Sequence, residues 1–396
     1  MKTITEDTIR CTGCRACEKA CTRGAISMTK NAEGFLYPQI DETNCIDCGI
    51  CKRICPAEKI VELKTPQKTY AAIHKDKEIL KDSSSGGVFT ALAEMVFEQG
   101  GVVVGCILDK DFYAKQVIVS RSEDLAACRG SKYVQSDTKD TYPQVKKLLD
   151  DGILVLYTGT PCQIAGLKNY LGHPYDHLLT ADFICHGVPS PQLFIQNILW
   201  LEKRNGNQIV NYRFRNKVGS YQFGLYYYYY FVRSTDVVGG SAVLDPYYFS
   251  FLNAKTYREC CYQCPYAQEK RCSDFTFADY WSVEKFHPEL DSDMGASILF
   301  MNTEKSLQYQ KNIEQNMALF PSKLEWMKQV NENLNQPAKR PDSRNRIYQT
   351  IQEMGYETWA NQYCSTLLWK LRNLYGKFPL GFRIRIKMIR KKWAKE

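Results

Sequence analysis

Two cysteine runs near the start of the chain constrain its fold more than any other feature. The segment CTGCRACEKAC places four cysteines at spacings of three, three and four, and CIDCGICKRICP repeats those spacings and adds a proline. The eight cysteines are Cys11, Cys14, Cys17, Cys21, Cys45, Cys48, Cys51 and Cys55. Such close spacing lets a tight turn wrap three thiolates around one inorganic cluster. A module built in this way needs little hydrophobic core, because the clusters hold it together.

The repeated C-x2-C-x2-C-x3-C pattern is the signature of bacterial dicluster ferredoxins, in which the fourth cysteine of each run ligates the cluster of the other run. We therefore expect two [4Fe-4S] clusters. The predicted ligands are Cys11, Cys14, Cys17 and Cys55 for one cluster, and Cys45, Cys48, Cys51 and Cys21 for the other. A disulfide scaffold or paired zinc sites are the alternatives, although zinc knuckles usually use two separate C-x2-C pairs.

The rest of the composition agrees with a reducing compartment. Nine of the 17 cysteines lie outside the two runs, and the N-terminal MKTITEDTIR lacks the apolar core of a signal peptide. The sequence contains no run of about 18 apolar residues, so we predict no membrane span. We expect a cytoplasmic protein with a ferredoxin domain over residues 1–64, an α/β domain over 65–300 and a helical region over 301–396.

After the short linker KTPQKTY, the pattern changes to alternating strands and helices. Strand-like segments at 70–74 and 101–108 flank SSSGGVFTALAEMVFEQGG, whose apolar residues recur at helical spacing. Ser83 to Ser85 are predicted to cap this helix, and Gly100 is predicted to end it. A Gly-rich turn before a helix presents backbone N–H groups that suit a phosphate. An ordinary helix start with a packing glycine pair would show the same pattern.

Two further units place cysteines at the ends of predicted strands. In GILVLYTGTPCQIAGLKNYLG, a buried strand precedes Thr160 and Gln163, which form a capping box, and Cys162 lies at the helix start. In LLTADFICHG, Cys185 and His186 follow the next strand. If the two strands are parallel, both thiols emerge at the edge of the sheet where α/β proteins place their sites.

A downstream loop supplies more cysteines: YRECCYQCPYAQEKRC contains Cys260, Cys261, Cys264 and Cys272. We expect a third [4Fe-4S] site, whose predicted ligands are Cys162, Cys185, Cys261 and Cys264. A zinc site, a nucleophilic Cys162–His186 pair and buried free thiols are the alternatives. We interpret Cys106, Cys128 and Cys364 as structural.

Six segments occur in one order: SSSGGVFTALAE, GSKYVQS, YTGTPCQIAGLKNYL, FICHGVPSP, FRNK and YRECCYQCPYA followed by SDFTFADYW. Together they resemble the coenzyme F-420 hydrogenase/dehydrogenase beta-subunit family, from about Ala71 to Trp281. The resemblance implies FAD bound beside a [4Fe-4S] cluster, and electron transfer between iron–sulfur carriers and a two-electron acceptor. Cys260 and Cys272 look like additions to the family pattern and remain fallback ligands.

The resemblance also suggests roles for individual residues. The turn residues Ser84, Ser85, Gly86 and Gly87, together with Lys132 and Tyr133, are predicted to bind the cofactor. Lys132 and His186 are predicted to act in catalysis as proton donors. An ordinary loop lysine, a packing tyrosine and a hydrogen-bonded histidine are the alternatives. Arg213 and Arg215 could clamp a phosphate, or they could lie on a solvated strand face.

The expected fold class is α+β and α/β: a dicluster ferredoxin-like module, a mixed α/β flavin-binding domain and a helical, basic C-terminal tail. The favoured function is an iron–sulfur flavoprotein oxidoreductase that takes electrons from a redox partner protein and reduces a small-molecule substrate, in a setting that includes surface polysaccharide metabolism. Oxidation of a reduced deazaflavin and a non-enzymatic electron-transfer subunit are the alternatives.

The positive charge is concentrated at the C-terminus. Residues 370–396 contain ten Lys or Arg and one acid, which accounts for the net charge of +9. Within 382–396 the apolar residues fall on one helical face, which is typical of a segment lying on an anionic membrane. We expect no nucleic-acid partner. A solvated tail or a docking face for an acidic partner is the favoured interpretation, and peripheral contact with the inner membrane surface is the alternative.

Overall fold

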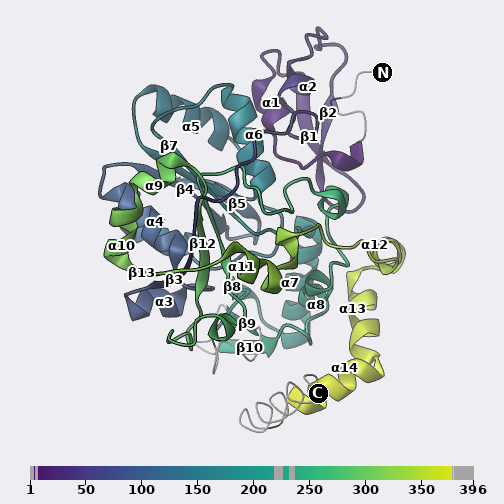
Figure 1. Ribbon diagram of the computed structural model, residues 1–396. Helices are drawn as coiled ribbons and strands as arrows, with labels where there is room; N and C mark the ends of the chain where they lie inside the picture. Colours follow the sequence, from purple (N-terminus) through teal and green to yellow (C-terminus); the bar gives the residue numbers. More distant parts are fainter. Residues whose placement is uncertain (1–3, 5–7, 218–225, 232–236, 377, 379–396) are drawn as a thin grey trace.

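The computed structural model describes residues 4, 8–217, 226–231, 237–376 and 378. A small N-terminal module lies beside helix α6 of a larger α/β body, and the last helices of the chain extend from that body (Figure 1). The basic segment 382–396 and its predicted membrane face lie outside the described residues. Within the described part of the chain, no helix has the length and apolar character needed to cross a bilayer.

The N-terminal module contains two short helices and one strand pair, which are α1 (Ala16–Ala20), α2 (Ile50–Arg53), β1 (Ile26–Lys30) and β2 (Leu36–Ile40). The two cysteine runs share one backbone turn. In the first run Gly13 and Arg15 flank the second cysteine with φ of 70° and 64°, and in the second run Asp47 and Gly49 do so with φ of 54° and 69°. The tight turn expected from the cysteine spacing is thus present twice.

The body is built on an eight-stranded mixed sheet with the order β13-β3-β12-β11-β7-β6-β4-β5. Its centre consists of four parallel strands, which are β4 (Val102–Leu108), β6 (Val155–Gly159), β7 (Leu178–Phe183) and β11 (Phe275–Asp279). The antiparallel strands at the edges are β5 (Ala114–Val119), β12 (Ser297–Met301), β3 (Lys68–His74) and β13 (Met317–Pro321). The strands before Cys162 and Cys185 are parallel neighbours, which is the condition for both thiols to emerge at one edge of the sheet.

The boundary expected at residue 300 falls inside β12, and the sheet continues beyond it. The reason is that β13 pairs with β3 at the start of the body, so the sheet is completed by a segment far along the chain.

Helices cover both faces of the sheet. They are α3 (Lys77–Asp82), α4 (Val88–Phe97), α5 (Thr141–Asp150), α6 (Pro161–Leu171), α9 (Glu304–Gln308), α10 (Gln310–Asn316) and α11 (Leu324–Val330). Helices α4 and α10 contribute to one buried cluster, and α5 and α6 contribute to another. The predicted capping box of Thr160 and Gln163 begins α6. The predicted serine cap of α4 is wrong, because Gly87 occupies the N-cap with φ of 85°.

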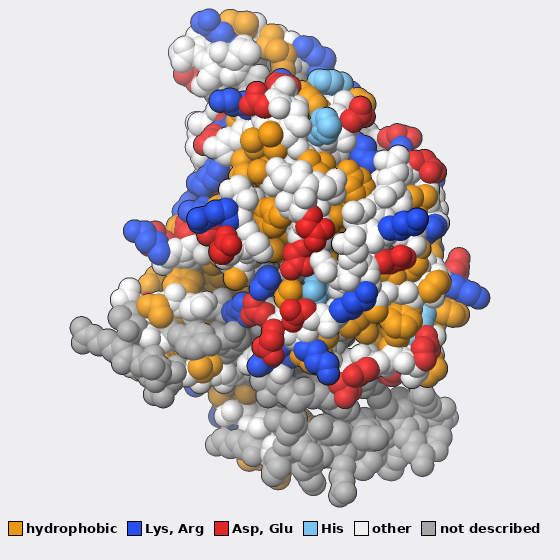
Figure 2. Space-filling model, turned by 90° about the vertical axis from the view of Figure 1, so that its left-hand side faces the viewer, with side chains coloured by type: hydrophobic (Ala, Val, Ile, Leu, Met, Phe, Trp, Pro, Cys, Tyr) orange, Lys and Arg blue, Asp and Glu red, His pale blue; other side chains and the backbone are white. Residues whose placement is uncertain are grey.

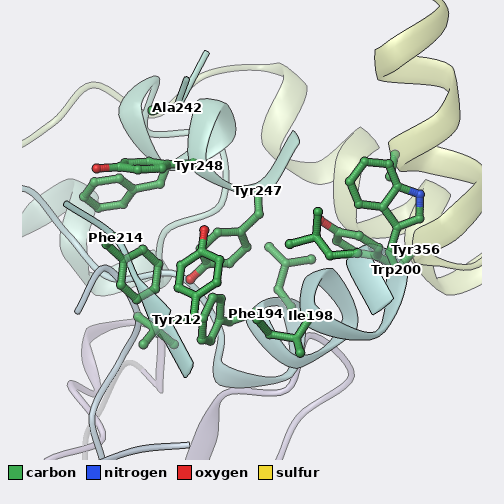
Figure 3. Close-up of a cluster of buried hydrophobic side chains, with 14 of the residues drawn as sticks. Phe194, Ile198, Trp200, Tyr212, Phe214, Ala242, Tyr247, Tyr248 and Tyr356 are labelled. Carbon is green, nitrogen blue, oxygen red and sulfur yellow. The ribbon is translucent and has the colours of Figure 1, made fainter. Parts of the chain in front are cut away.

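A second layer surrounds an aromatic core (Figure 3). It contains α7 (Pro191–Asn205), α8 (Pro246–Leu252) and the antiparallel strands β8 (Ile209–Arg213), β9 (Tyr226–Phe231) and β10 (Val237–Ser241). The Phe194 ring centroid lies 4.8 Å from that of Phe214 and 5.2 Å from that of Tyr247. Strand β9 contains a run of five consecutive tyrosines at 226–230.

The C-terminal helices are α12 (Ser343–Met354), α13 (Tyr356–Ser365) and α14 (Leu367–Gly376). Tyr356 and Trp359 of α13 join the aromatic core, so these helices are anchored to the body. On the face of the body shown in Figure 2, Lys and Arg side chains are interspersed with Asp and Glu side chains. This mixture agrees with a charge balance that is even outside residues 370–396.

Candidate iron–sulfur and cofactor sites

Four cysteines from the two runs meet inside the N-terminal module. Cys11, Cys14, Cys17 and Cys55 are buried. Burial raises the pKa of Cys14 to about 12, and the neighbouring Cys55 and Cys11 act in the same direction. Burial also raises the pKa of Cys17, and Cys14, Cys11 and Cys55 add to the effect. The last cysteine of the second run therefore lies with the first three of the first run, which is the placement that crossed ligation requires. We name these four thiols the inner set.

The other four cysteines of the runs, which we name the outer set, lie nearer the surface. Cys48 is exposed, and Cys21, Cys45 and Cys51 are partly buried. Burial raises the pKa of Cys51, and Cys48 and Cys45 act in the same direction, so these three thiols are neighbours. Cys21 packs against the same module core as Cys51. The outer set is thus the more accessible of the two.

A cavity of about 100 Å³ lies where the module meets the body, and residues such as Ile9, Thr12 and Ala57 form its module wall. The cysteines that line it are Cys162, Cys185, Cys260, Cys261 and Cys264. They come from the start of α6, the end of β7 and the turn at Glu259–Gln263. The structure therefore brings together the four thiols predicted for a third cluster, and it adds Cys260 as a fifth candidate.

The other fallback ligand lies elsewhere. Cys272 does not line the cavity, and its thiol donates to the carbonyl oxygen of Pro161 at 3.3 Å. Its Sγ also lies 3.6 Å from the carboxylate of Asp182. Cys272 is therefore placed as a buried thiol with hydrogen-bonding partners of its own.

A [4Fe-4S] cluster and a single metal ion place different demands on the cavity thiols. Among the described residues, no three His, Cys, Asp or Glu side chains are placed to share one metal ion. A [4Fe-4S] cluster makes a different demand, because each of its thiolates binds a separate iron atom. Burial raises the pKa of Cys185, and it raises that of Cys264 to about 11. These thiols would release protons on binding a cluster.

Helix α6 connects the cavity with the inner set. Cys162 lies in its first turn, and Gly166 lies one turn later. A Cβ atom added at Gly166 would lie 2.9 Å from Cys14 Sγ, so the helix packs directly against an inner-set thiol. Helix α6 therefore carries one cavity cysteine and packs against one inner-set cysteine.

The Gly-rich turn is occupied by contacts within the protein. The Gly86 N–H donates to Ser297 Oγ at 2.8 Å, and a Cβ atom at Gly86 would lie 2.2 Å from the Ala72 carbonyl oxygen. A Cβ atom at Gly87 would lie 2.8 Å from His74 Cβ. Since the Gly86 N–H already has an acceptor, it is not free for the predicted phosphate contact. The packing alternative explains both glycines.

The two serines of this turn are also engaged. Ser85 Oγ donates to the Ala296 carbonyl oxygen at 2.8 Å, and Ser84 Oγ accepts from the Ser131 N–H at 2.7 Å. Ser84 therefore joins the turn to the loop that carries Lys132 and Tyr133.

Contacts within the protein hold the ammonium group of Lys132, and its roles in catalysis and cofactor binding stay predictions. Its ammonium group donates to the carbonyl oxygens of Ala127, Cys128 and Arg129 at 2.9 to 3.0 Å. Three acceptors use all three ammonium hydrogens. Lys132 is therefore a cap on the end of a 3-10 helix (Ser122–Cys128).

Tyr133 and His186 have different surroundings. The Tyr133 ring stacks on Phe251 with centroids 4.5 Å apart, and its hydroxyl accepts from Arg215 at 3.0 Å. His186 is exposed at the surface next to Cys185. Contact of Tyr133 with a cofactor and proton donation by His186 both remain predictions.

Cationic side chains converge around the Gly-rich turn. Lys217 Nζ donates to the carbonyl oxygens of Ser85, at 2.9 Å, and Leu80. Burial, followed by the nearby Arg215, lowers the pKa of Lys217 to about 7. Arg213 pairs with Asp82, which also lies 3.8 Å from Arg129.

Arg215 completes this group, and its guanidinium donates to Asp279 at 2.9 Å. The group, which we name the cationic cluster, comprises Arg129, Arg213, Arg215 and Lys217. Within the part of the chain that the structure describes, carboxylate contacts of these four cations go to Asp82 and Asp279. The sequence motif FRNK contained Lys217, but its distance from the turn along the chain concealed the contact.

Comparisons with known proteins identify the family of the chain. The family model "Coenzyme F420 hydrogenase/dehydrogenase, beta subunit N-term" matches residues 69–141, and the corresponding C-terminal model matches residues 153–324. The chain belongs to this family. A 4Fe-4S dicluster domain matches residues 10–59 and covers both cysteine runs.

Individual relatives are more distant. This chain is 28% identical over 165 residues to one of the subunits of the F(420)H(2) dehydrogenase of Methanosarcina mazei, and the match covers 39% of this chain and 46% of that protein. It is 28% identical over 172 residues to the coenzyme F420-dependent sulfite reductase of Methanocaldococcus jannaschii, covering 42% and 26%. The match therefore spans less than half of either relative.

A solved structure of the F420-reducing [NiFe] hydrogenase complex from Methanosarcina barkeri contains a chain that aligns with a TM-score of 0.47 and 20% identity. The alignment covers 69% of this chain and 90% of that chain.

Proposed function

We propose that this protein is an electron-transfer oxidoreductase subunit, in which the outer, inner and cavity cysteines hold three [4Fe-4S] clusters in series next to a flavin or deazaflavin site. The observation that supports this function best is the cavity in which cysteines from three separate segments meet beside the inner set. A subunit that relays electrons fits this arrangement better than the self-contained small-molecule reductase favoured by the sequence. The name of one relative, a dehydrogenase subunit, agrees with that preference.

The burial of the thiols suggests the order in which electrons would pass from the surface to the cavity. The outer set includes the exposed Cys48, so it is the surface at which a redox partner protein would exchange electrons. The inner set is buried and contacts α6 through Gly166, which leads to Cys162 at the cavity. Clusters held at these positions would carry single electrons.

The cationic cluster is the proposed site for the two-electron cofactor. Arg213 and Lys217 lie against the Gly-rich turn, and cations of this kind bind phosphate oxygens. FAD and a phosphate-bearing deazaflavin present the same phosphate chemistry to these side chains. Either cofactor would supply hydride chemistry when bound.

Extraction of the anaerobically purified protein tests this function. We expect a flavin or deazaflavin to be released at about one per chain, and we expect cofactor and clusters to exchange electrons when a chemical reductant is added. Protein that holds iron but no flavin or deazaflavin would reduce the proposal to an electron carrier. Protein that holds neither would overturn it.

Lys217 should make cofactor binding depend on pH. Its pKa is lowered to about 7 by burial and by Arg215, so an anionic ligand must restore its proton above that pH. Affinity for the extracted cofactor should then fall as pH rises from 7 to 9, by up to about tenfold per unit. In Lys217→Met we expect affinity to be about tenfold lower at pH 6 and nearly independent of pH.

Equilibrium titration of cofactor fluorescence measures both effects. Arg121→Met is the matched control, because Arg121 is exposed and pairs with Asp124 outside the cationic cluster. A parent protein whose affinity does not change between pH 6 and 9 would remove Lys217 from the site.

We also propose that α14 contacts an anionic membrane surface. Its exposed leucines are Leu367, Leu368, Leu371 and Leu374, with exposures between 55% and 73%. The seven Lys or Arg of residues 382–396 follow them in the sequence. An apolar helix face next to basic residues is the combination that binds anionic lipid.

Vesicle flotation tests this contact. The full chain should float with vesicles rich in phosphatidylserine, and both truncation after residue 381 and the double change Leu371→Ser, Leu374→Ser should lower the floating fraction severalfold. Vesicles of phosphatidylcholine alone are the control for charge. Equal flotation of all three proteins would remove the membrane proposal and favour a docking role for an acidic partner protein.

A further inference from the structure

Three arginine side chains are among the largest that the fold buries fully: Arg258, Arg271 and Arg344. Two of them have carboxylate partners. Arg271 donates to Asp182 at 3.0 Å, and Arg344 pairs with Glu33 at 2.6 Å and with Glu259 at 2.7 Å. Arg258 is 0% exposed, and no carboxylate of the described residues pairs with it. A guanidinium taken out of water without a counter-ion is costly, so its position calls for a source of negative charge.

On one side Arg258 is held by the N-terminal module. Its Nε donates to the Cys11 carbonyl oxygen at 2.7 Å, and its Nη2 donates to the Leu36 carbonyl oxygen at 2.9 Å. The same Nη2 lies 3.6 Å from Cys11 Sγ. The guanidinium carbon lies 4.0 Å from the centre of the Tyr37 ring. These contacts fix the charge at the edge of the inner set.

On the other side Arg258 borders the cavity. It lines the cavity with Cys260 and Cys261, and the Cys261 N–H donates to its carbonyl oxygen at 2.9 Å. The module turn at Gly13 packs against the Arg258 side chain, since a Cβ atom at Gly13 would lie 3.1 Å from Arg258 Nη1. One buried arginine thus contacts the inner set through its guanidinium and lines the cavity beside Cys260 and Cys261.

We propose that Arg258 is the shared counter-ion of the inner and cavity clusters and raises the reduction potential of both. The part that concerns the cavity cluster rests on the proposed function. A cluster with four thiolates carries negative charge and gains one more on reduction, so a nearby cation stabilises the reduced state more than the oxidised one. An electron moving between the two positions oxidises one cluster by one electron, reduces the other by one, and needs no proton. Because Arg258 adjoins both positions, its attraction changes little during that transfer.

Redox titration of the full chain, monitored by electron paramagnetic resonance, tests the proposal. Arg258→Met removes the charge and keeps an unbranched side chain. At a fixed potential we expect the ratio of reduced to oxidised inner cluster to fall about tenfold or more, which is about 59 mV for a one-electron couple. Arg258→Lys keeps the charge but loses the guanidinium fork, and we expect its ratio to stay within about threefold of the parent.

Arg344→Met is the matched control. Arg344 is equally buried and also joins the module to the turn before the cavity, but Glu33 and Glu259 already neutralise its charge. We expect this substitution to change the ratio of reduced to oxidised inner cluster by less than about threefold.

Iron content separates this proposal from the proposed function. If the parent holds only the eight irons of the module, about four per cluster, the cavity cluster fails while the effect of Arg258 on the inner cluster is still measured. Arg258→Met with full iron and an unchanged potential would overturn the proposal. If Arg258→Met does not fold, a tenfold change in the ratio of reduced to oxidised inner cluster in Arg258→Lys would also overturn the proposal.

Discussion

Anaerobically purified protein is expected to contain about twelve iron atoms per chain, and Cys162→Ala is expected to remove about four of them. Cys162 lines the cavity from the first turn of α6, and its loss would leave one iron of a cavity cluster without its thiolate. The module clusters use other cysteines and should stay loaded. Iron analysis together with the absorption of the purified variants measures the loss.

Two further substitutions sharpen this expectation. Cys272→Ala is the matched control, because Cys272 is buried nearby but hydrogen-bonds to Pro161 instead of lining the cavity. Its iron content should equal that of the parent. Separate Ala variants of Cys260 and Cys261 decide which of these neighbours is the ligand. A parent with about eight irons, unaffected by Cys162→Ala, would show that the cavity holds no cluster.

Gly86→Ala should be among the most destabilising single changes in the body. The added Cβ atom would lie 2.2 Å from the Ala72 carbonyl oxygen and 2.5 Å from the Ser297 nitrogen, and both are backbone atoms of sheet strands. Backbone in a sheet cannot move aside cheaply, so we expect the free energy of unfolding to fall by about 3 kcal/mol or more. Denaturant titration measures the change.

Gly100→Ala is the control at the other end of the same helix. Gly100 has φ of 71° with nothing within 4 Å of the added Cβ atom, so only backbone strain of about 1 kcal/mol is expected. In both variants the protein that remains folded should keep its full share of cofactor. Folded Gly86→Ala protein that has lost the cofactor would instead support the phosphate cradle that the sequence predicts for this turn.

Local patterns account for the backbone features that position the cysteines. The cysteine spacing predicted the paired turns at Gly13–Arg15 and Asp47–Gly49, because three thiols so close in sequence leave few backbone paths. The placement of Cys162 and Cys185 at one edge followed from parallel strands, whose carboxyl ends share an edge.

Long-range contacts explain what the sequence did not reveal. The Gly86 N–H finds its acceptor in Ser297, 211 residues away, and this distant bond distinguishes a packing glycine from a phosphate cradle. Arg258 finds its partners in Cys11 and Leu36, more than 200 residues earlier. In sequence it is merely an arginine before two cysteines. Lys132 resembled a catalytic lysine because nothing in GSKYVQS shows that three nearby carbonyl oxygens hold its ammonium group.

The close fit of the module against the body has a consequence for how electrons enter. Arg15 pairs with Asp137, Thr138 Oγ1 donates to the Cys14 carbonyl oxygen at 3.1 Å, and Gly166 leaves the Cys14 thiol no gap. A tethered shuttle that swings out to collect electrons would have to break all of these contacts in every cycle. If the proposed function holds, the module is a fixed conduit, and a redox partner would have to come to the exposed outer set to deliver electrons.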